Sequence, residues 1–357
     1  MSLKLVISAA ILAIAIGVWM NSVKTGTEEQ DVLNYSLRAV IVVVLTIGIG
    51  AWMKSIKIGP VCDSNTDLTG KTVLITGGNV GVGKETATGL AKHNAKVIIA
   101  CRNSLKAVTE IRLESGNDLV TFMKLDLAEM ADVRQFANEF IAKEERLDIL
   151  VNNAGIITDG KTKDNFDMMF GINHLGPFLL TNLLLPLLRK TSKKNPVRIV
   201  NVASKIYAAG KIDFNNLNPD VDSNSGMKEI FLKYANTKLM NIYFTSELDK
   251  RLKSENVAIT TYSVHSGNVD SSFAHDVAQR CGLLWAYFNK FFCGFASMTP
   301  YYGAQSSLHC CLEEGIEDRS KEFFVKLRPI EIDAVATDPA IGTKLWNVSE
   351  GLTGLTD

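Results

Sequence analysis

The sequence has 357 residues, of which 46% are hydrophobic, and its 38 basic and 38 acidic side chains give a formal net charge of zero. This length suits one α/β domain with additional segments. The balanced charge lacks the basic excess of a nucleic-acid-binding domain, so we expect no nucleic-acid partner.

The first stretch of the chain carries two unbroken apolar runs, at residues 5–20 and 39–53. Each is about 15 residues long, whereas a comfortable membrane span needs ~20. The flanking side chains of Lys4, Arg38 and Lys54 can extend both runs by snorkelling. We therefore predict a membrane anchor made of two hydrophobic segments. A shallow hairpin that never crosses the bilayer is the alternative for both runs, and a cleaved signal peptide is the alternative for the first.

The charges around these runs predict the orientation of the anchor. The linker at 21–38 is the more acidic part, whereas Lys4, Lys54 and Lys57 lie at the outer ends. By the positive-inside tendency both outer ends face the cytosol.

The six cysteines show no zinc-type spacing with histidine, so we expect reduced thiols and no metal. These observations predict a protein of the endoplasmic reticulum membrane with its globular domain in the cytosol, the lipid-droplet surface being an alternative location.

A polar linker at 58–70 separates the anchor, residues 1–57, from a globular part that begins at Lys71. From there, β-branched apolar runs alternate with amphipathic stretches. We predict strands at 72–76, 96–100, 119–125, 148–151, 198–202 and 258–264. We predict helices at 84–93, 104–115, 130–145, 166–188 and 234–253. This alternation predicts an α/β fold with a doubly wound parallel sheet of the Rossmann type. We assign residues 71–330 to this domain and 331–357 to a C-terminal extension packed on it.

A glycine-rich segment follows the first predicted strand and opens a helix. Its glycines let the backbone turn tightly and approach a pyrophosphate at the positive end of the helix. A glycine-rich turn without a ligand is the alternative, but the order of strand, glycines and helix favours cofactor binding. The candidate cofactor-binding residues here are Thr76, Gly77, Asn79, Gly81, Val82 and Gly83.

Arg102 follows directly after the second predicted strand. A carboxylate near this point would hold the ribose 2′-hydroxyl of NAD, whereas an arginine offers a cation to a 2′-phosphate. Lys84 in the glycine-rich segment is a further candidate for the same phosphate. Solvated surface charge is the alternative for both side chains. The pattern predicts a preference for NADP(H).

Tyr234 and Lys238 are four residues apart, so they share one face of a helix. A phenol has a pKa of about 10, and a nearby ammonium lowers that pKa. The pair can then exchange a proton with a substrate hydroxyl or carbonyl oxygen. By itself this spacing is common by chance, and it gains weight from the motifs upstream.

Together these motifs resemble the short-chain dehydrogenase/reductase family over about residues 71–264. The likeness rests on the glycine segment and Tyr-x-x-x-Lys together with Leu125-Asp126-Leu127, Asn152-Asn153-Ala154-Gly155, Asn173 and Ser204. Finer matches are similar to the retinol dehydrogenase branch of that family. They are Ala100-Cys101-Arg102, Asn173-His174-Leu175-Gly176, the segments 198–202 and 261–265, Ser307-Leu308-His309-Cys310 and Leu345-Trp346.

The resemblance implies a role for each site residue. Asp126 would hydrogen-bond the adenine ring, with Leu127 beside it, and Asn153, Ala154 and Gly155 would lie at the adenosine side of the cofactor. Ser204 would hydrogen-bond the substrate oxygen and Tyr234 would donate the proton. Lys238 would hold the nicotinamide ribose and lower the Tyr234 pKa, and Asn173 would help hold a water linked to Lys238. The loop after the sixth strand would add Gly267, Val269 and Ser271 to the cofactor site. Turn-capping asparagines and a helix-capping Ser204 are the alternatives.

The sequence departs from the family pattern at two positions. Ser266 precedes Gly267 where the family usually has proline, and the loss of a fixed φ predicts a looser loop over the nicotinamide. Ala203 stands where this branch often has a first serine, a change that we regard as neutral.

The segment from Cys281 to Ala296 is rich in Leu, Trp, Tyr and Phe. A substrate lid, a membrane-dipping helix and a homodimer contact are competing interpretations, and a lid against the bilayer unites the first two.

The whole sequence predicts a membrane-anchored NADP(H)-dependent oxidoreductase for a lipophilic alcohol or aldehyde, with retinal and retinol as the best guess. A reductase of steroids or other lipid carbonyls is the chemical alternative. The alternative from a different functional class is a membrane scaffold protein with weak catalytic activity.

Overall fold

The structure, a computed structural model, describes residues 59–219, 226–267, 269 and 298–355. The chain divides into two units, Met1–Ile58 and Gly59–Asp357, and the fold described below is that of the second. Both predicted anchor runs and the aromatic segment from Cys281 to Ala296 lie outside the described residues.

The described residues form one sheet of eight strands in the order β3-β2-β1-β4-β5-β6-β7-β8. Neighbouring strands are parallel except for the antiparallel pair β7 and β8. The strands are β1 (Thr72–Thr76), β2 (Lys96–Cys101), β3 (Val120–Lys124), β4 (Ile149–Asn152), β5 (Val197–Ala203), β6 (Ile259–His265), β7 (Phe323–Val325) and β8 (Arg328–Ile330). The predicted Rossmann-type parallel sheet is confirmed.

Strand β1 shows why the sheet carries helices on both faces. All five of its residues are buried, as expected of a parallel strand between two helix layers. Successive side chains point to opposite faces. Leu74 accordingly belongs to one hydrophobic cluster, whereas Val73 and Ile75 belong to the other.

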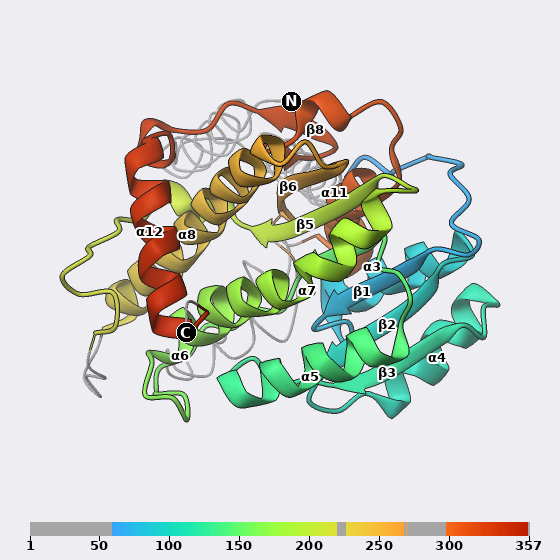
Figure 1. The fold of residues 1–357 in the computed structure, drawn as a ribbon, viewed down its shortest axis with the longest axis horizontal. Helices are drawn as coiled ribbons and strands as arrows, with labels where there is room; N and C mark the ends of the chain where they lie inside the picture. Colours follow the sequence, from blue (N-terminus) through green and yellow to red (C-terminus); the bar gives the residue numbers. More distant parts are fainter. Residues whose placement is uncertain (1–58, 220–225, 268, 270–297, 356–357) are drawn as a thin grey trace, which may run out of the picture. The chain divides into compact units, whose positions relative to one another are not determined.

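Two helix layers cover the sheet (Figure 1). On one side α3 (Gly81–Lys92), α4 (Leu105–Ser115) and α11 (Pro300–Leu312) supply the cluster that contains Val73. On the other side lie α5 (Met130–Lys143), α6 (Met168–Phe170), α7 (Gly176–Ser192) and α8 (Met227–Ser254), with α12 (Pro339–Thr353) packed on α8. Shorter helical turns are η1 (Gly171–Leu175), η2 (Lys205–Ala209), η3 (Glu317–Arg319) and η4 (Ala334–Ala336).

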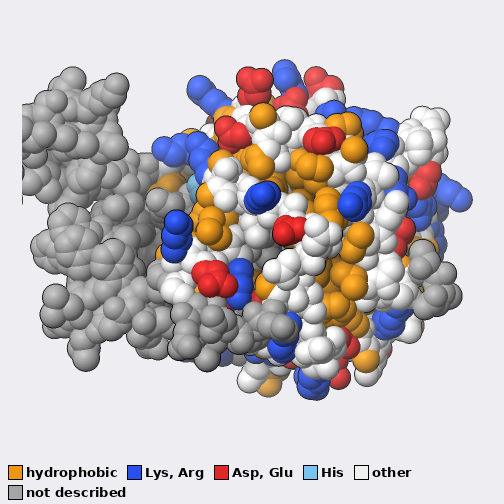
Figure 2. Space-filling view, turned by 90° about the vertical axis from the view of Figure 1, so that its left-hand side faces the viewer, with side chains coloured by type: hydrophobic (Ala, Val, Ile, Leu, Met, Phe, Trp, Pro, Cys, Tyr) orange, Lys and Arg blue, Asp and Glu red, His pale blue; other side chains and the backbone are white. Residues whose placement is uncertain are grey.

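The C-terminal helix α12 is held by aromatic packing. The Trp346 ring lies 4.9 Å from the ring of Phe178 in α7, and the Arg251 guanidinium stacks 4.3 Å above the same indole. Basic and acidic side chains are intermixed with apolar ones on the molecular face that contains α12 (Figure 2).

Among the described residues, the helical stretch Met168–Ser192 is long and apolar enough to cross a bilayer. Its apolar window is 78% buried inside the domain. It therefore serves as a core helix, with α7 contributing Phe178, Leu184 and Leu188 to the cluster beneath the sheet.

The strand order reverses between β1 and β4, so chain connections leave in opposite directions from these neighbours. In open α/β sheets, ligands bind in the crevice at the carboxyl ends of strands at such a point. The glycine-rich segment follows β1 and the Asn153 segment follows β4. The topology therefore brings two of the predicted cofactor motifs to one edge.

Candidate active site

The glycine-rich segment forms a tight cradle between β1 and α3. Gly77 and Gly81 have φ of +65° and +57°, a region that favours glycine. A Cβ added at Gly83 would lie 2.2 Å from the Gly77 carbonyl oxygen and 2.3 Å from Asn153 Nδ2. Helix α3 begins here with no side-chain cap and no acidic residue in its first turn. Its N-terminal amides and this close backbone packing fit a pyrophosphate group.

Thr76 and Asn153 join the ends of β1 and β4. The Thr76 hydroxyl oxygen accepts hydrogen bonds from the amides of Asn153 at 3.0 Å and Ala154 at 3.1 Å. The Asn153 side chain donates to the carbonyls of Thr76 at 2.9 Å and Gly77 at 3.2 Å. These two predicted cofactor residues therefore shape the cradle by binding one another.

At the end of β3, the predicted adenine-side residues form a turn. The Asp126 carboxylate accepts a hydrogen bond from the amide of Ala128 at 3.0 Å, and the Asp126 amide donates to Asp132 at 2.6 Å. Leu127 is buried, and a Cβ at Gly176 of α7 would lie 2.8 Å from the Leu127 carbonyl oxygen. The Leu127 side chain thus belongs to the core.

Arg102 and Lys84 differ in their surroundings. Arg102 is exposed just after β2, and within the described part of the chain its guanidinium has no ion-pair partner. Lys84 forms ion pairs with Glu110 at 2.6 Å and Glu114 at 3.1 Å, both in α4. These two carboxylates neutralise the Lys84 ammonium, so the expectation that Lys84 serves a phosphate is not supported. Sequence alone could not show that α4 packs its acidic face against α3.

Lys238 and Asn173 meet beside Gly155. The Lys238 ammonium donates to the Val202 carbonyl oxygen of β5 at 2.9 Å. The Asn173 carbonyl oxygen Oδ1 accepts from the Ile156 amide at 2.8 Å, and its Nδ2 donates to the Ile156 carbonyl at 2.9 Å. A Cβ at Gly155 would lie 3.4 Å from Lys238 Nζ and 3.5 Å from Asn173 Oδ1. The chain after β4 therefore passes Gly155 within van der Waals reach of both side chains.

The local structure around Asn173 differs from the continuous helix that was predicted for 166–188. Asn173 lies in η1, a π-helical turn between α6 and α7. A π-helical turn inserts an extra residue into the helix, and such turns are frequent at functional sites. Here it aims the Asn173 amide at the Ile156 backbone and at the Thr237 hydroxyl, 3.2 Å from Nδ2.

Tyr234 lies one turn before Lys238 in α8, and its ring centroid is 5.4 Å from Lys238 Nζ. The ring is half-buried against a small cluster that contains Ile156, Ile157 and Met169. Tyr234 and Lys238, the predicted catalytic pair, thus both lie against the loop that follows β4.

Ser204 follows the last residue of β5, and its hydroxyl oxygen accepts from the Ile206 amide at 3.4 Å, which caps η2. The end of η2 packs on α8, since a Cβ at Gly210 would lie 2.8 Å from the Ala235 carbonyl oxygen. The Lys211 amide also donates to Asn236 Oδ1 at 2.8 Å. These contacts place Ser204 and Tyr234 on adjoining elements, and the capping bond leaves the Ser204 proton able to point to a substrate.

His265, at the end of β6, lies beside the segment that carries Ser204. It was not among the predicted site residues. It pairs in register with Ala203, and its Nδ1 accepts from the Lys205 amide at 3.4 Å. Burial, together with the charges of Lys205 and Lys238, lowers the pKa of His265 to about 4. The imidazole is therefore neutral near pH 7 and adds no positive charge beside Lys238.

Burial controls the titration of the Tyr–Lys pair. It raises the pKa of the Tyr234 phenol above its ordinary value, opposite to the direction expected from the Tyr-x-x-x-Lys spacing. It also lowers the pKa of the Lys238 ammonium to about 8. The ammonium is directed to the Val202 carbonyl, so loss of solvation outweighs the attraction that the sequence pattern predicts.

We expect kcat/KM for the cofactor, which reports on the enzyme before cofactor binding, to fall above about pH 8. The Lys238 ammonium loses its proton in this range, and with it the positive charge that can hold ribose hydroxyls. Tyr234 stays protonated because its pKa is raised. The measurement is a pH profile of initial rates at limiting cofactor, and a flat profile to pH 9.5 (about 1.5 units above that pKa) would contradict the role of Lys238.

The loop after β6 reaches the glycine cradle. Gly267 has φ +81°, and Val269 bridges to Met298. A Cβ at Gly303 in α11 would lie 2.5 Å from Val269 and 3.0 Å from Val82, so Gly303 permits this loop to meet α3. Sequence inspection missed Gly303, although an isolated glycine inside a helical pattern was a usable signal. Ser271 lies outside the described residues.

A separate open groove lies between α8, η4, α12 and the β7–β8 hairpin. Its lining includes Tyr243, Glu247, Lys250 and Ile330, and none of the predicted site residues. We therefore do not assign it to the reaction.

Comparison with known proteins agrees with this geometry. A family profile described as short chain dehydrogenase matches residues 71–216. Retinol dehydrogenase 11 of Homo sapiens is 42% identical over 300 residues, which cover 83% of this chain and 89% of that protein. Dehydrogenase/reductase SDR family member 13 of Homo sapiens is 40% identical over 300 residues, covering 83% and 76%.

Solved structures show the same fold. An uncharacterized protein from Mycobacterium paratuberculosis matches with a TM-score of 0.63 and 30% identity, over 82% of this chain and 96% of that one. The RhlG/NADP complex of Pseudomonas aeruginosa matches with a TM-score of 0.57 and 22% identity, over 74% and 97%. The chain therefore belongs to the short-chain dehydrogenase/reductase family and is an oxidoreductase of its retinol dehydrogenase-like branch.

Proposed function

We propose that this protein reduces long apolar aldehydes, of which retinal is the proposed substrate, using NADPH at a membrane surface. The observation that supports the reductase chemistry is that Lys238 and Tyr234 lie one turn apart on α8, with the Lys238 ammonium bound to Val202 of β5, two residues before Ser204. A nicotinamide cofactor follows from the family.

The bound nicotinamide would supply hydride to the carbonyl carbon of the aldehyde. Tyr234, protonated because of its raised pKa, would donate its phenolic proton to the carbonyl oxygen. Ser204 would donate a hydrogen bond to that oxygen and fix its position. Lys238 would donate to the ribose hydroxyls, and its positive charge would stabilise the Tyr234 phenolate after proton transfer.

The proposal of NADP(H) as cofactor rests on Arg102. Its exposed guanidinium follows β2, where NAD-binding enzymes carry an acid that holds the ribose 2′-hydroxyl. An arginine fork binds phosphate oxygens in a bidentate manner. A cytosolic NADP pool that is mostly reduced would favour aldehyde reduction.

Two features support a lipophilic substrate. The similar curated proteins include several named retinol dehydrogenase. The segment from Cys281 to Ala296 can supply an apolar lining, and burying each methylene contributes about 0.8 kcal/mol.

Substrate chain length is expected to control the Michaelis constant. KM should fall steeply from short aldehydes to retinoid-sized ones, until the pocket is full. The reason is that each added methylene group is transferred from water into the apolar pocket. The double change Trp285→Ala and Phe288→Ala should raise KM for long aldehydes more than for short ones. The measurement is initial-rate kinetics with an aldehyde series in liposomes, with steroid ketones alongside.

The short aldehydes are the internal control, since they need the catalytic groups but not the apolar lining. A flat response to chain length would contradict the lipid proposal and leave the reductase chemistry standing. Faster turnover of steroid ketones than of retinal would favour the alternative substrate class.

We further propose that residues 1–57 hold the protein in the endoplasmic reticulum membrane with the catalytic domain in the cytosol. Two apolar runs with basic outer flanks support this proposal. Protease added to sealed microsomes should digest the catalytic domain completely, whereas a lumenal marker stays intact. Protection of the domain until detergent is added would show that the domain faces the lumen and would contradict the proposed topology.

A further inference from the structure

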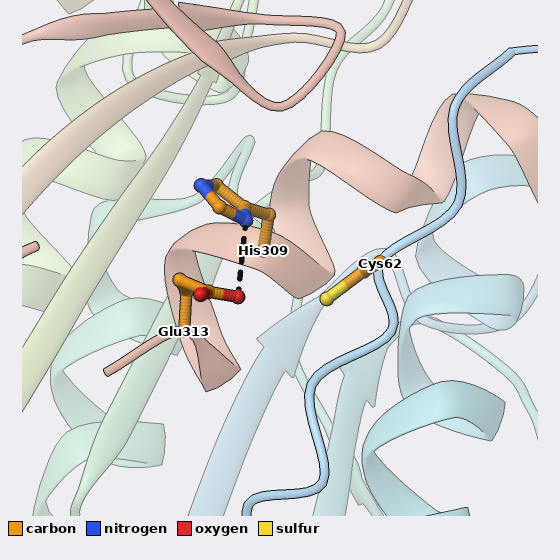
Figure 3. Close-up of side chains that lie close together, drawn as sticks. All are labelled: Cys62, His309 and Glu313. Carbon is orange, nitrogen blue, oxygen red and sulfur yellow. Dashed lines mark ion pairs between the residues drawn. The ribbon is translucent and has the colours of Figure 1, made fainter. Parts of the chain in front are cut away.

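A cluster of three metal-ligating side chains lies on the helix layer opposite α8. His309 and Glu313 are one turn apart on α11, and Cys62 lies in the segment that precedes β1 (Figure 3). The sulfur, imidazole and carboxylate ligand atoms all lie within 4.8 Å of one another. His309 Nδ1 is 3.5 Å from Glu313 Oε2.

These separations are close to those that a tetrahedral ion requires. Zinc bonds of about 2.0–2.3 Å to nitrogen, oxygen and sulfur leave tetrahedral ligand atoms roughly 3.3–3.7 Å apart. The His309–Glu313 pair already meets this requirement. A rotation of the Cys62 side chain that moves its sulfur by roughly 1 Å would bring it into the same range.

The segment that carries Cys62 is fixed to α11 on both sides of the cluster. The Cys62 amide donates to Gln305 Oε1 at 2.9 Å. Further along, the hydroxyls of Ser64 and Thr66 donate to the Leu312 carbonyl at 3.1 Å and 2.7 Å. These bonds hold the backbone on either side of Cys62 against α11 and so keep the thiol next to His309 and Glu313.

We propose that Cys62, His309 and Glu313 bind a zinc ion, with water completing the coordination. One thiolate and one carboxylate balance the two positive charges of the ion. The thiol must lose its proton on binding, as in other cysteine sites. Arg198, the nearby cation, is already bound to Glu317 at 2.8 Å and to the Cys310 carbonyl at 3.2 Å.

The three side chains are only partly buried, so an ion can reach them. A bound ion would fasten the segment around Cys62 to α11. Helix α11 in turn packs on α3, where a Cβ at Gly89 would lie 2.6 Å from Leu308. The site would therefore brace the helix that carries the cofactor cradle, without contacting the reacting groups.

The test uses the full-length protein in detergent, stripped of metal and titrated with Co²⁺, whose thiolate complexes absorb in the near ultraviolet. We expect one Co²⁺ per chain with a thiolate-to-cobalt band that Zn²⁺ abolishes by displacement. Cys62→Ser should remove the band. His309→Gln and Glu313→Gln should each weaken binding more than about 100-fold, the upper range for loss of an outer partner alone.

Matched variants separate this site from adventitious binding. Glu314→Gln removes the neighbouring exposed carboxylate, and Cys101→Ser removes another free thiol, so both should bind Co²⁺ as the unmodified chain does. The melting temperature should rise with Zn²⁺ in these two variants but not in Cys62→Ser. A band that survives Cys62→Ser, or an affinity insensitive to Glu313→Gln, would overturn the proposal.

Discussion

Replacing Tyr234 by Phe is expected to lower turnover by at least about 100-fold, the usual scale of general acid–base assistance. The change removes one oxygen, the atom that would donate the proton, and leaves the ring packed against Ile156 and Met169. Cofactor binding should therefore be retained. The measurements are kcat for aldehyde reduction and the dissociation constant of NADPH by fluorescence.

Tyr243→Phe is the matched control for this prediction. Tyr243 lies in the same helix, and its hydroxyl donates to the Val335 carbonyl at 2.8 Å, away from the site. This variant loses a hydroxyl and a hydrogen bond but should keep its turnover. Near-normal turnover of a well-folded Tyr234→Phe protein would contradict the proposal that Tyr234 donates the proton.

Replacing Arg102 by Asp is expected to weaken NADP(H) binding and to narrow or reverse the preference over NAD(H). A hydrogen bond to a charged group contributes on the order of 1.5–3 kcal/mol, about ten- to a hundredfold in affinity. The new carboxylate would repel the 2′-phosphate and can accept a hydrogen bond from the 2′-hydroxyl of NAD. Dissociation constants for both cofactors, in both proteins, measure the effect.

The control is Lys143→Asp, which makes the same change in net charge. Lys143 ends α5 just before β4 begins, so it lies at the opposite edge of the sheet from Arg102, and it is 61% exposed. Its substitution should leave the cofactor preference unchanged. Equal binding of NADP(H) and NAD(H) by the unmodified protein would show that Arg102 does not select the cofactor.

Local pattern predicted the sheet and most of its helices. The first six strands lie within one or two residues of their predicted bounds, because buried parallel strands are continuous apolar runs. Strands β7 and β8 and helices α11 and α12 were not predicted. The first two have only three residues each, too few for a periodic signal.

The tertiary structure decided what individual charged and polar side chains do. Lys84 and Arg102 are equivalent cations in the sequence, yet only Lys84 is neutralised by α4. Asn173 was expected on a regular helix, but it lies in a π-helical turn, from which its side chain accepts a hydrogen bond from the Ile156 amide in the loop after β4. The attraction predicted between the Lys238 ammonium and the Tyr234 phenolate is outweighed by loss of solvation, because Lys238 is buried and the Tyr234 ring is half-buried.

The sequence by itself determined the fold class, the order of the motifs and the chemistry that they resemble, because glycine spacing, strand periodicity and a Tyr–Lys helical pair are local properties of the chain. Only the tertiary structure brought Cys62 beside His309 and Glu313, and Gly303 against Val82. These pairs lie far apart in the sequence. Their proximity follows from how α11 packs on α3 and the segment before β1, which no local pattern records.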